Sequence, residues 1–159
     1  MTETERMLAQ YDQVMHGIAW HGDPIWQILE GISAQHAVHR PLADVHSIWE
    51  LLLHVQAWDR AGLIRLNGKA CQMKGVKNFP PVIAPGDGAW RETVAQVKAT
   101  HDELVEVVAG LPESRLREQV PGKRYDFYHM LHGIAQHELY HAGQIALLKK
   151  MQGKVRSQR

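Results

Sequence analysis

The chain has 159 residues, a formal net charge of +1 and 45% hydrophobic residues, which is typical of one globular domain, here spanning residues 1–159. The near balance of charge gives no argument for nucleic-acid binding, and no apolar run approaches the roughly 20 residues of a transmembrane helix. One cysteine allows no internal disulfide, and the acidic, polar N-terminus is not typical of a signal peptide. These features predict a cytoplasmic protein without a membrane or nucleic-acid partner.

Helical periodicity begins at the N-terminus. Thr2 and Glu5 form a capping-box pair, in which each side chain can bond the backbone N–H of the other residue. The apolar stripe that follows predicts a helix over about 2–33, with a possible break near Gly22.

The second and third helices are predicted over about 47–66 and 88–109. Ser47 and Glu50 form another capping box at the start of the second, and Asp87 is placed to cap the third. The segment between these two helices is rich in proline and glycine and shows neither a repeat nor a strand pattern. Because long loops inside a compact domain often carry function, this segment is of interest.

The fourth helix is predicted over about 126–151. Four amphipathic segments of this length, joined by loops, indicate an all-α protein built as a four-helix bundle.

Two histidines on the fourth helix are four residues apart. His137 and His141 therefore lie on one face, close enough to share a divalent metal ion. Because a chain with 11 histidines is expected to contain about 0.7 such pairs by chance, the spacing alone proves nothing. Their position within the apolar stripe adds information, since a buried imidazole needs a partner. Two interpretations stay open, namely metal ligands and core histidines bonded to a carbonyl or carboxylate.

The segment from His137 to His141 also matches the metalloprotease pattern H-E-x-x-H, in which Glu138 would be the general base. That pattern needs a third ligand downstream, and no Asp or Glu follows Glu138. In the metzincin continuation Leu147 stands where the third histidine would be. A protease is therefore disfavoured, and a third ligand would have to lie upstream, where His54 is a candidate. His101 and the remaining histidines are interpreted as surface, cap or packing residues.

Two blocks of the chain resemble the DinB/YfiT-like superfamily of metalloenzymes. They are Ser47–His54 and His137–Ile145, separated by the Gly68 turn and the long loop, in the order that the family shows. The resemblance covers nearly the whole chain. It implies a four-helix bundle with up-down-down-up topology and long crossover loops, and also a homodimer.

The same resemblance implies a metal site formed by His54, His137 and His141, with open positions for water or substrate. The metal would be zinc or nickel, with manganese as a further candidate. Relatives in the family use low-molecular-weight thiols in S-transfer and isomerisation. Three imidazoles with an open position are the ligand set of a catalytic zinc site, where a bound water or thiol loses its proton near neutral pH.

Further residues are candidates for supporting roles. Glu138 and Gln144 are catalytic candidates, and Trp58 and Gln144 are candidates for contact with a cofactor. Glu50, Asp59 and Glu138 are candidate acceptors for the second ring nitrogens of the histidine ligands. The predicted function is a metal-dependent thiol S-transferase acting on a small molecule. The alternatives are a metal-dependent hydrolase and a non-catalytic metal-binding or stress-response bundle.

Overall fold

The computed structural model describes residues 1–156, and that part of the chain is helical without strands. The prediction of an all-α protein is confirmed. The helices are α1 (Glu3–Met15), α2 (Ile25–Leu29), α3 (Ala34–Val38), α4 (Ile48–Leu66), α5 (Asp87–Ala109) and α6 (Phe127–Arg156), with two short 3-10 helices, η1 (Gly75–Lys77) and η2 (Glu113–Arg117). None of them, within the described residues, is long and apolar enough to cross a membrane.

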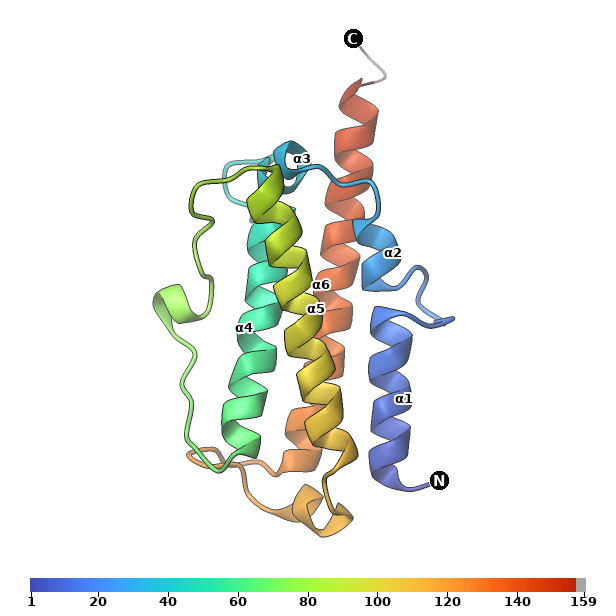
Figure 1. The fold of residues 1–159 in the computed structure, drawn as a ribbon, viewed down its shortest axis with the longest axis vertical. Coiled ribbons are helices and arrows are strands. Elements are labelled where there is room, and N and C mark those ends of the chain that lie inside the picture. The colour runs from blue at the N-terminus through green and yellow to red at the C-terminus, as the bar shows by residue number, and fades with distance from the viewer. Residues whose placement is uncertain (157–159) are drawn as a thin grey trace.

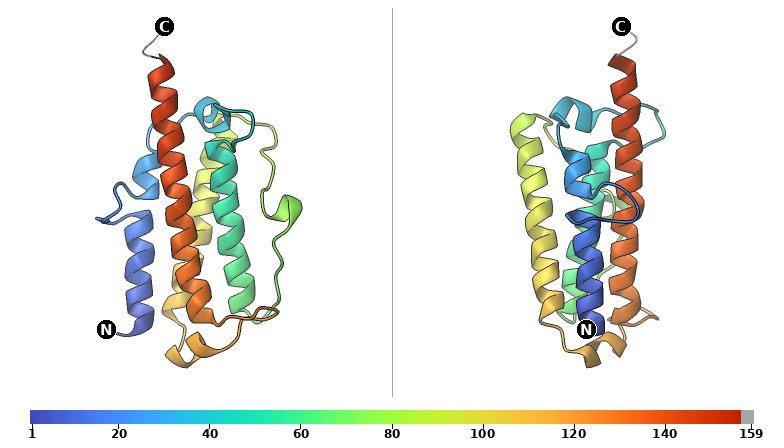
Figure 2. Two further views of the ribbon diagram at one scale, coloured as in Figure 1. Left: turned by 180° about the vertical axis from the view of Figure 1, so that it is seen from behind. Right: turned by 90° about the vertical axis from the view of Figure 1, so that its right-hand side faces the viewer.

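The four longest helices, α1, α4, α5 and α6, lie side by side (Figures 1 and 2). Helix α2 continues the column of α1, α3 lies over the adjoining ends of α4 and α5, and residues 67–86 run back along α4 (Figure 1). That long connection passes over one flank of the molecule, where it contacts α4.

Both predicted capping boxes are present. The Ser47 side chain accepts a hydrogen bond from the Glu50 backbone N–H at 3.2 Å, and the Glu50 carboxylate accepts one from the Ser47 N–H at 2.8 Å. Thr2 and Glu5 make the same pair of bonds at the start of α1. Because the box fixes where α4 begins, it also fixes the face on which His54 emerges. The third predicted cap is different, since Asp87 lies inside the first turn of α5, after Gly86 as N-cap residue.

The helix predicted over 2–33 is not continuous: it is broken around Gly22, where a possible break was predicted, and its first part ends earlier than expected. Helix α1 ends at Met15, where the N–H groups of His16 and Gly17 both bond the Asp12 carbonyl at 2.8 Å. The chain then leaves helical geometry through Gly22, whose φ of +117° is a conformation that glycine adopts readily. The short helix α2 occupies part of the second half of the predicted element, and α3 follows just beyond its predicted end.

The apolar core consists of two clusters with a polar layer between them. One cluster joins α2 and α3 to the start of α4 and the end of α6, and the other joins α1 and η2 to the end of α4 and the start of α6. Between them, at mid-height, α4, α5 and α6 contribute Asp59, His101 and Glu138, all buried. Buried titratable groups need hydrogen-bond or charged partners, and the same requirement applies to the histidines beside this layer.

Candidate metal centre

Three histidines from two helices converge at one point beside this polar layer. His54 lies on α4, and His137 and His141 lie one turn apart on α6. The Nε2 atom of His137 is 2.9 Å from Nε2 of His54 and 3.1 Å from Nε2 of His141. All three ligand atoms lie within 4.8 Å of one another, so a single cation could contact them all.

Hydrogen bonds at the opposite ring nitrogens set the tautomers. The Nδ1–H of His54 donates to the Asn78 carbonyl at 2.5 Å, and the Nδ1–H of His141 donates to the Gln144 side-chain oxygen at 2.6 Å. Both rings therefore carry their proton on Nδ1 and direct the Nε2 lone pair towards His137. Facing lone pairs at this distance require a proton or a cation between them, and metal ligands are commonly held by such bonds. The donor set therefore fits a divalent metal ion.

The electrostatics of the site favour neutral rings. Burial, together with the nearby rings of His141 and His54, lowers the pKa of His137 to about 3. Burial also lowers the pKa of His54 and of His141. Neutral imidazole is the form that binds a metal, so protons compete weakly for this site at neutral pH.

The long loop contributes residues that the sequence patterns did not identify. Asn78 accepts the His54 bond through its backbone, and its side-chain oxygen accepts a hydrogen bond from the Trp58 indole N–H at 2.9 Å. The Phe79 ring stacks on the His54 ring with a centroid separation of 3.9 Å, and on the His46 ring at the same separation. The loop thus holds the His54 ring in place, and its length was the only signal in the sequence that pointed to this role.

Glu138 belongs to a second, fully buried group. Its Oε1 lies 3.1 Å from Nδ1 of His101, and the Asp59 carboxylate lies 3.9 Å from the same nitrogen. Burial raises the pKa of Glu138 to about 8 and raises that of Asp59 well above its usual value. These three side chains form a separate set of potential ligand atoms. The interpretation of His101 as a surface, cap or packing residue missed this pairing.

Some of the predicted supporting residues lie at the histidine site, and one of them does not. Gln144 lies at the site, bonded to His141, and the Trp58 ring lies 5.5 Å from the His137 ring. By contrast, Glu50 caps α4 and pairs with Arg40, so it is not an acceptor for a histidine ligand.

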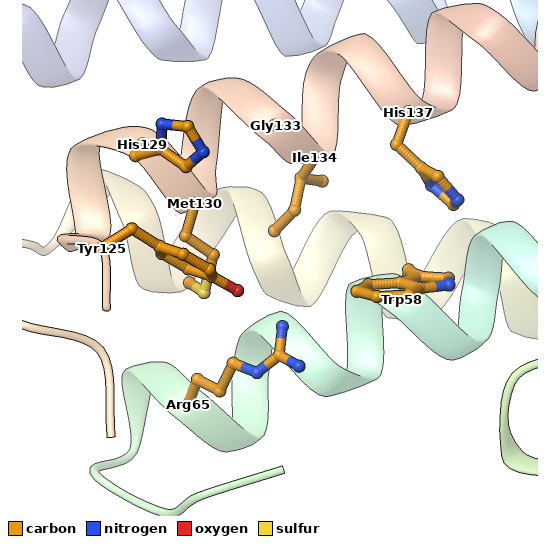
Figure 3. Close-up of a pocket in the computed structure, with 8 residues that line it drawn as sticks. All are labelled: Trp58, Arg65, Tyr125, His129, Met130, Gly133, Ile134 and His137. Carbon is orange, nitrogen blue, oxygen red and sulfur yellow. The ribbon is translucent and has the colours of Figure 1, made fainter. Parts of the chain in front are cut away.

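A groove of about 210 Å³ opens beside His137, between α4 and α6 (Figure 3). Trp58 forms one wall near His137, Ile134 points into the groove from α6, and Met130 lies beside Tyr125 towards the other end. The other lining residues are Arg65, Tyr125, His129 and Gly133. A small molecule in this groove would lie against one of the three converging histidines.

Comparison with known proteins identifies one family. A family model described as the DinB superfamily matches residues 18–145, a segment that contains His54, His137 and His141. No curated protein and no solved structure matches the chain.

Proposed function

The chain belongs to the DinB superfamily, and on that premise we propose that it is a metal-dependent enzyme that transfers a thiol to a small molecule. His54, His137 and His141 would hold one divalent metal ion. The observation that carries the proposal is the convergence of three Nε2 atoms within 4.8 Å, two of them presented as lone pairs by bonds to Asn78 and Gln144. When bound, the metal would lower the pKa of a thiol or water so that a nucleophile forms at neutral pH.

The groove beside His137 supports an enzyme over a protein that only stores metal. Small-molecule sites are concave and mostly apolar, with a few polar groups, and this groove combines Trp58, Met130 and Ile134 with Arg65 and His137. The position of Trp58 supports its proposed role as a wall against the bound molecule. A non-catalytic metal-binding bundle is the alternative, and it would not need this space.

The donor set limits the choice of metal. Imidazole nitrogens suit zinc and nickel, which we propose as the resident ions. Manganese prefers oxygen ligands and is the weaker candidate for a site of three imidazoles.

The surroundings of Glu138 argue against protease chemistry. A general base must reach the reacting water, whereas Glu138 is fully buried and paired with His101. We propose that Gln144 orients His141 and that Glu138 stabilises α6 next to His137 without touching substrate. Hydrolysis by an activated water is the second proposed activity, since the same groove would serve it.

We further propose that α1, α4, α5 and α6 form the up-down-down-up bundle with long crossover loops, as supported by the course of the chain in Figure 1. The homodimer and the cytoplasmic location stay predictions.

The activity can be tested with a chromogenic electrophile, such as an activated aryl halide, offered with and without a panel of low-molecular-weight thiols. We expect metal-loaded protein to accelerate the reaction only when thiol is present, and His54→Ala to abolish the effect. His39→Ala removes an exposed histidine and is the matched control. Turnover of ester substrates without thiol would instead identify a hydrolase. No rate enhancement for either class, with metal bound, would contradict the proposal of an enzyme.

A further inference from the structure

Arg65 is a buried cation, and none of the described side chains is its counterion. Its side chain is 2% exposed, and it lies in the last turn of α4. One guanidinium nitrogen donates to the Cys71 carbonyl at 2.8 Å, while Nε is buried without a partner. Among residues 1–152, whose side chains the structure describes, no carboxylate lies within 4.0 Å of it. An unpaired buried charge is costly, so a native fold that keeps one usually gives it a ligand or a role.

The groove beside His137 is the space into which Arg65 points. Figure 3 shows its guanidinium extending between Tyr125 and Trp58, towards the face of α6 that carries Ile134. The guanidinium carbon lies 5.6 Å from the centre of the Trp58 ring. None of the eight lining residues is acidic, so the positive charge of Arg65 acts on the space without local cancellation.

We propose that this groove binds a small organic molecule through a carboxylate that pairs with Arg65. The planar guanidinium presents parallel N–H donors that match the two oxygens of a carboxylate. The apolar body of the molecule lies against Trp58 and Ile134, and its other end reaches His137. A single cation suits a monoanion better than a phosphate dianion. The inference deepens the proposed function, because it assigns a substrate or thiol class to the same site.

The dimensions agree with a short, elongated ligand. Trp58 lies between the two ends, 5.5 Å from the His137 ring centre and 5.6 Å from the guanidinium carbon. Because both separations are measured to the Trp58 ring, the guanidinium carbon of Arg65 lies at most about 11 Å from the centre of the His137 ring. A cavity of about 210 Å³ is small for a ligand site, which limits the number of atoms in the ligand.

A purely structural role for Arg65 is the competing explanation. Its bond to Cys71 fastens the start of the long loop, and cations are favourable at a helix C-terminus. A guanidinium with only that role would not distinguish a carboxylate from a neutral group in the groove.

The two explanations are separated by a matched pair of probes, 6-mercaptohexanoate and 6-mercaptohexanol. They differ only at the end that would face Arg65. Isothermal titration calorimetry on the metal-free chain measures the carboxylate preference, and the sulfur-to-cobalt charge-transfer band of the Co²⁺-loaded chain reports whether the thiol reaches the metal. We expect the acid to bind roughly 10-fold to 100-fold more tightly than the alcohol, the range of a charge-assisted hydrogen bond in a buried site.

The variants then assign the preference to one residue. Arg65→Met should remove it and Arg65→Lys should retain part of it, whereas Arg60→Met, an exposed arginine on the same helix, should leave it unchanged. A charge-transfer band with the acid would indicate that the thiol cofactor is the molecule that carries the carboxylate. Tight binding of the acid without the band would indicate that the electrophilic substrate carries it. Either result supports the anion site.

Equal affinity of the unsubstituted chain for acid and alcohol would overturn the inference, even if Arg65→Met failed to fold. This outcome is distinct from failure of the proposed function. If the chain binds no cobalt but still prefers the acid, the proposed anion site is supported and the proposed metal site is refuted. If the chain binds cobalt and has equal affinity for the two probes, the proposed metal site is supported and the proposed anion site is refuted.

Discussion

The Gln144 side chain offers a direct test of how the site is held. Its oxygen accepts the Nδ1–H of His141 at 2.6 Å and so keeps the proton off Nε2, the atom that faces the metal position. Replacing it with leucine would remove the acceptor and also exclude water from its place. Since such supporting residues typically change metal affinity by about 10-fold to 100-fold, Gln144→Leu should weaken zinc binding by about 1.4–2.8 kcal/mol.

A smaller loss is expected for Gln144→Ala, because Gln144 is half-buried and water can enter to accept the bond. Gln144→Glu supplies a charged acceptor and should bind zinc at least as tightly as the original chain. Gln136→Ala, on an exposed position of the same helix, is the matched control.

The affinities can be compared by competition with a chromophoric zinc chelator at neutral pH. The predicted order, from tightest to weakest, is glutamate, glutamine, alanine and leucine at position 144. An affinity of Gln144→Leu within about twofold of the unsubstituted chain would refute the reasoning that this hydrogen bond prepares His141 for the metal.

Three further predictions concern stability. Burial lowers the pKa of His137 to about 3, so below pH 6.5 the unfolded metal-free chain binds a proton that the native chain does not, and stability to urea should fall with pH relative to that of His137→Gln; parallel profiles for the two chains would contradict this. Glu138, with its pKa raised to about 8, makes the native state bind more protons between pH 4.5 and 8, so its own contribution to stability should fall as the pH rises through that window, opposite in sign to the contribution of His137. Glu138→Gln should flatten that fall, and parallel profiles for the two chains would count against it. Gly62→Ala should lower Tm by several degrees, at a cost of about 1–3 kcal/mol, because the new Cβ would lie 2.7 Å from Cδ1 of Ile134. Gly143→Ala has open space around its Cβ and should raise Tm slightly in the same calorimetric scan.

The long helices could be predicted from sequence because their signals are local. The box of Ser47 and Glu50 sets the start of α4, and the apolar spacing continues to Leu66, where the observed helix ends. In the segment 2–33 the same reasoning indicated a possible break near Gly22, where the backbone turns to a positive φ, but it did not predict that α1 already ends at Met15. Periodicity reports which residues could share a face and does not report whether the chain remains helical between them.

The candidate site likewise has features that could be predicted from local sequence and features that depend on how distant segments pack. The spacing of His137 and His141 is local, and the resemblance to the family supplied His54. The contacts of Asn78 and Phe79 with His54 depend on where a loop of about 20 residues comes to rest, and no short-range pattern records that. The pairing of His101 with Glu138 likewise follows from the packing of α5 against α6 and not from spacing along either helix.

The central claim is that His54, His137 and His141 bind one divalent metal ion. Elemental analysis of purified, untagged protein, beside the His54→Ala and His141→Ala variants, tests it most directly. We predict about one zinc or nickel ion per chain, lost in both variants and retained in His39→Ala. No metal under any loading condition, or full stoichiometry in both variants, would contradict the account and leave a helical bundle with core histidines.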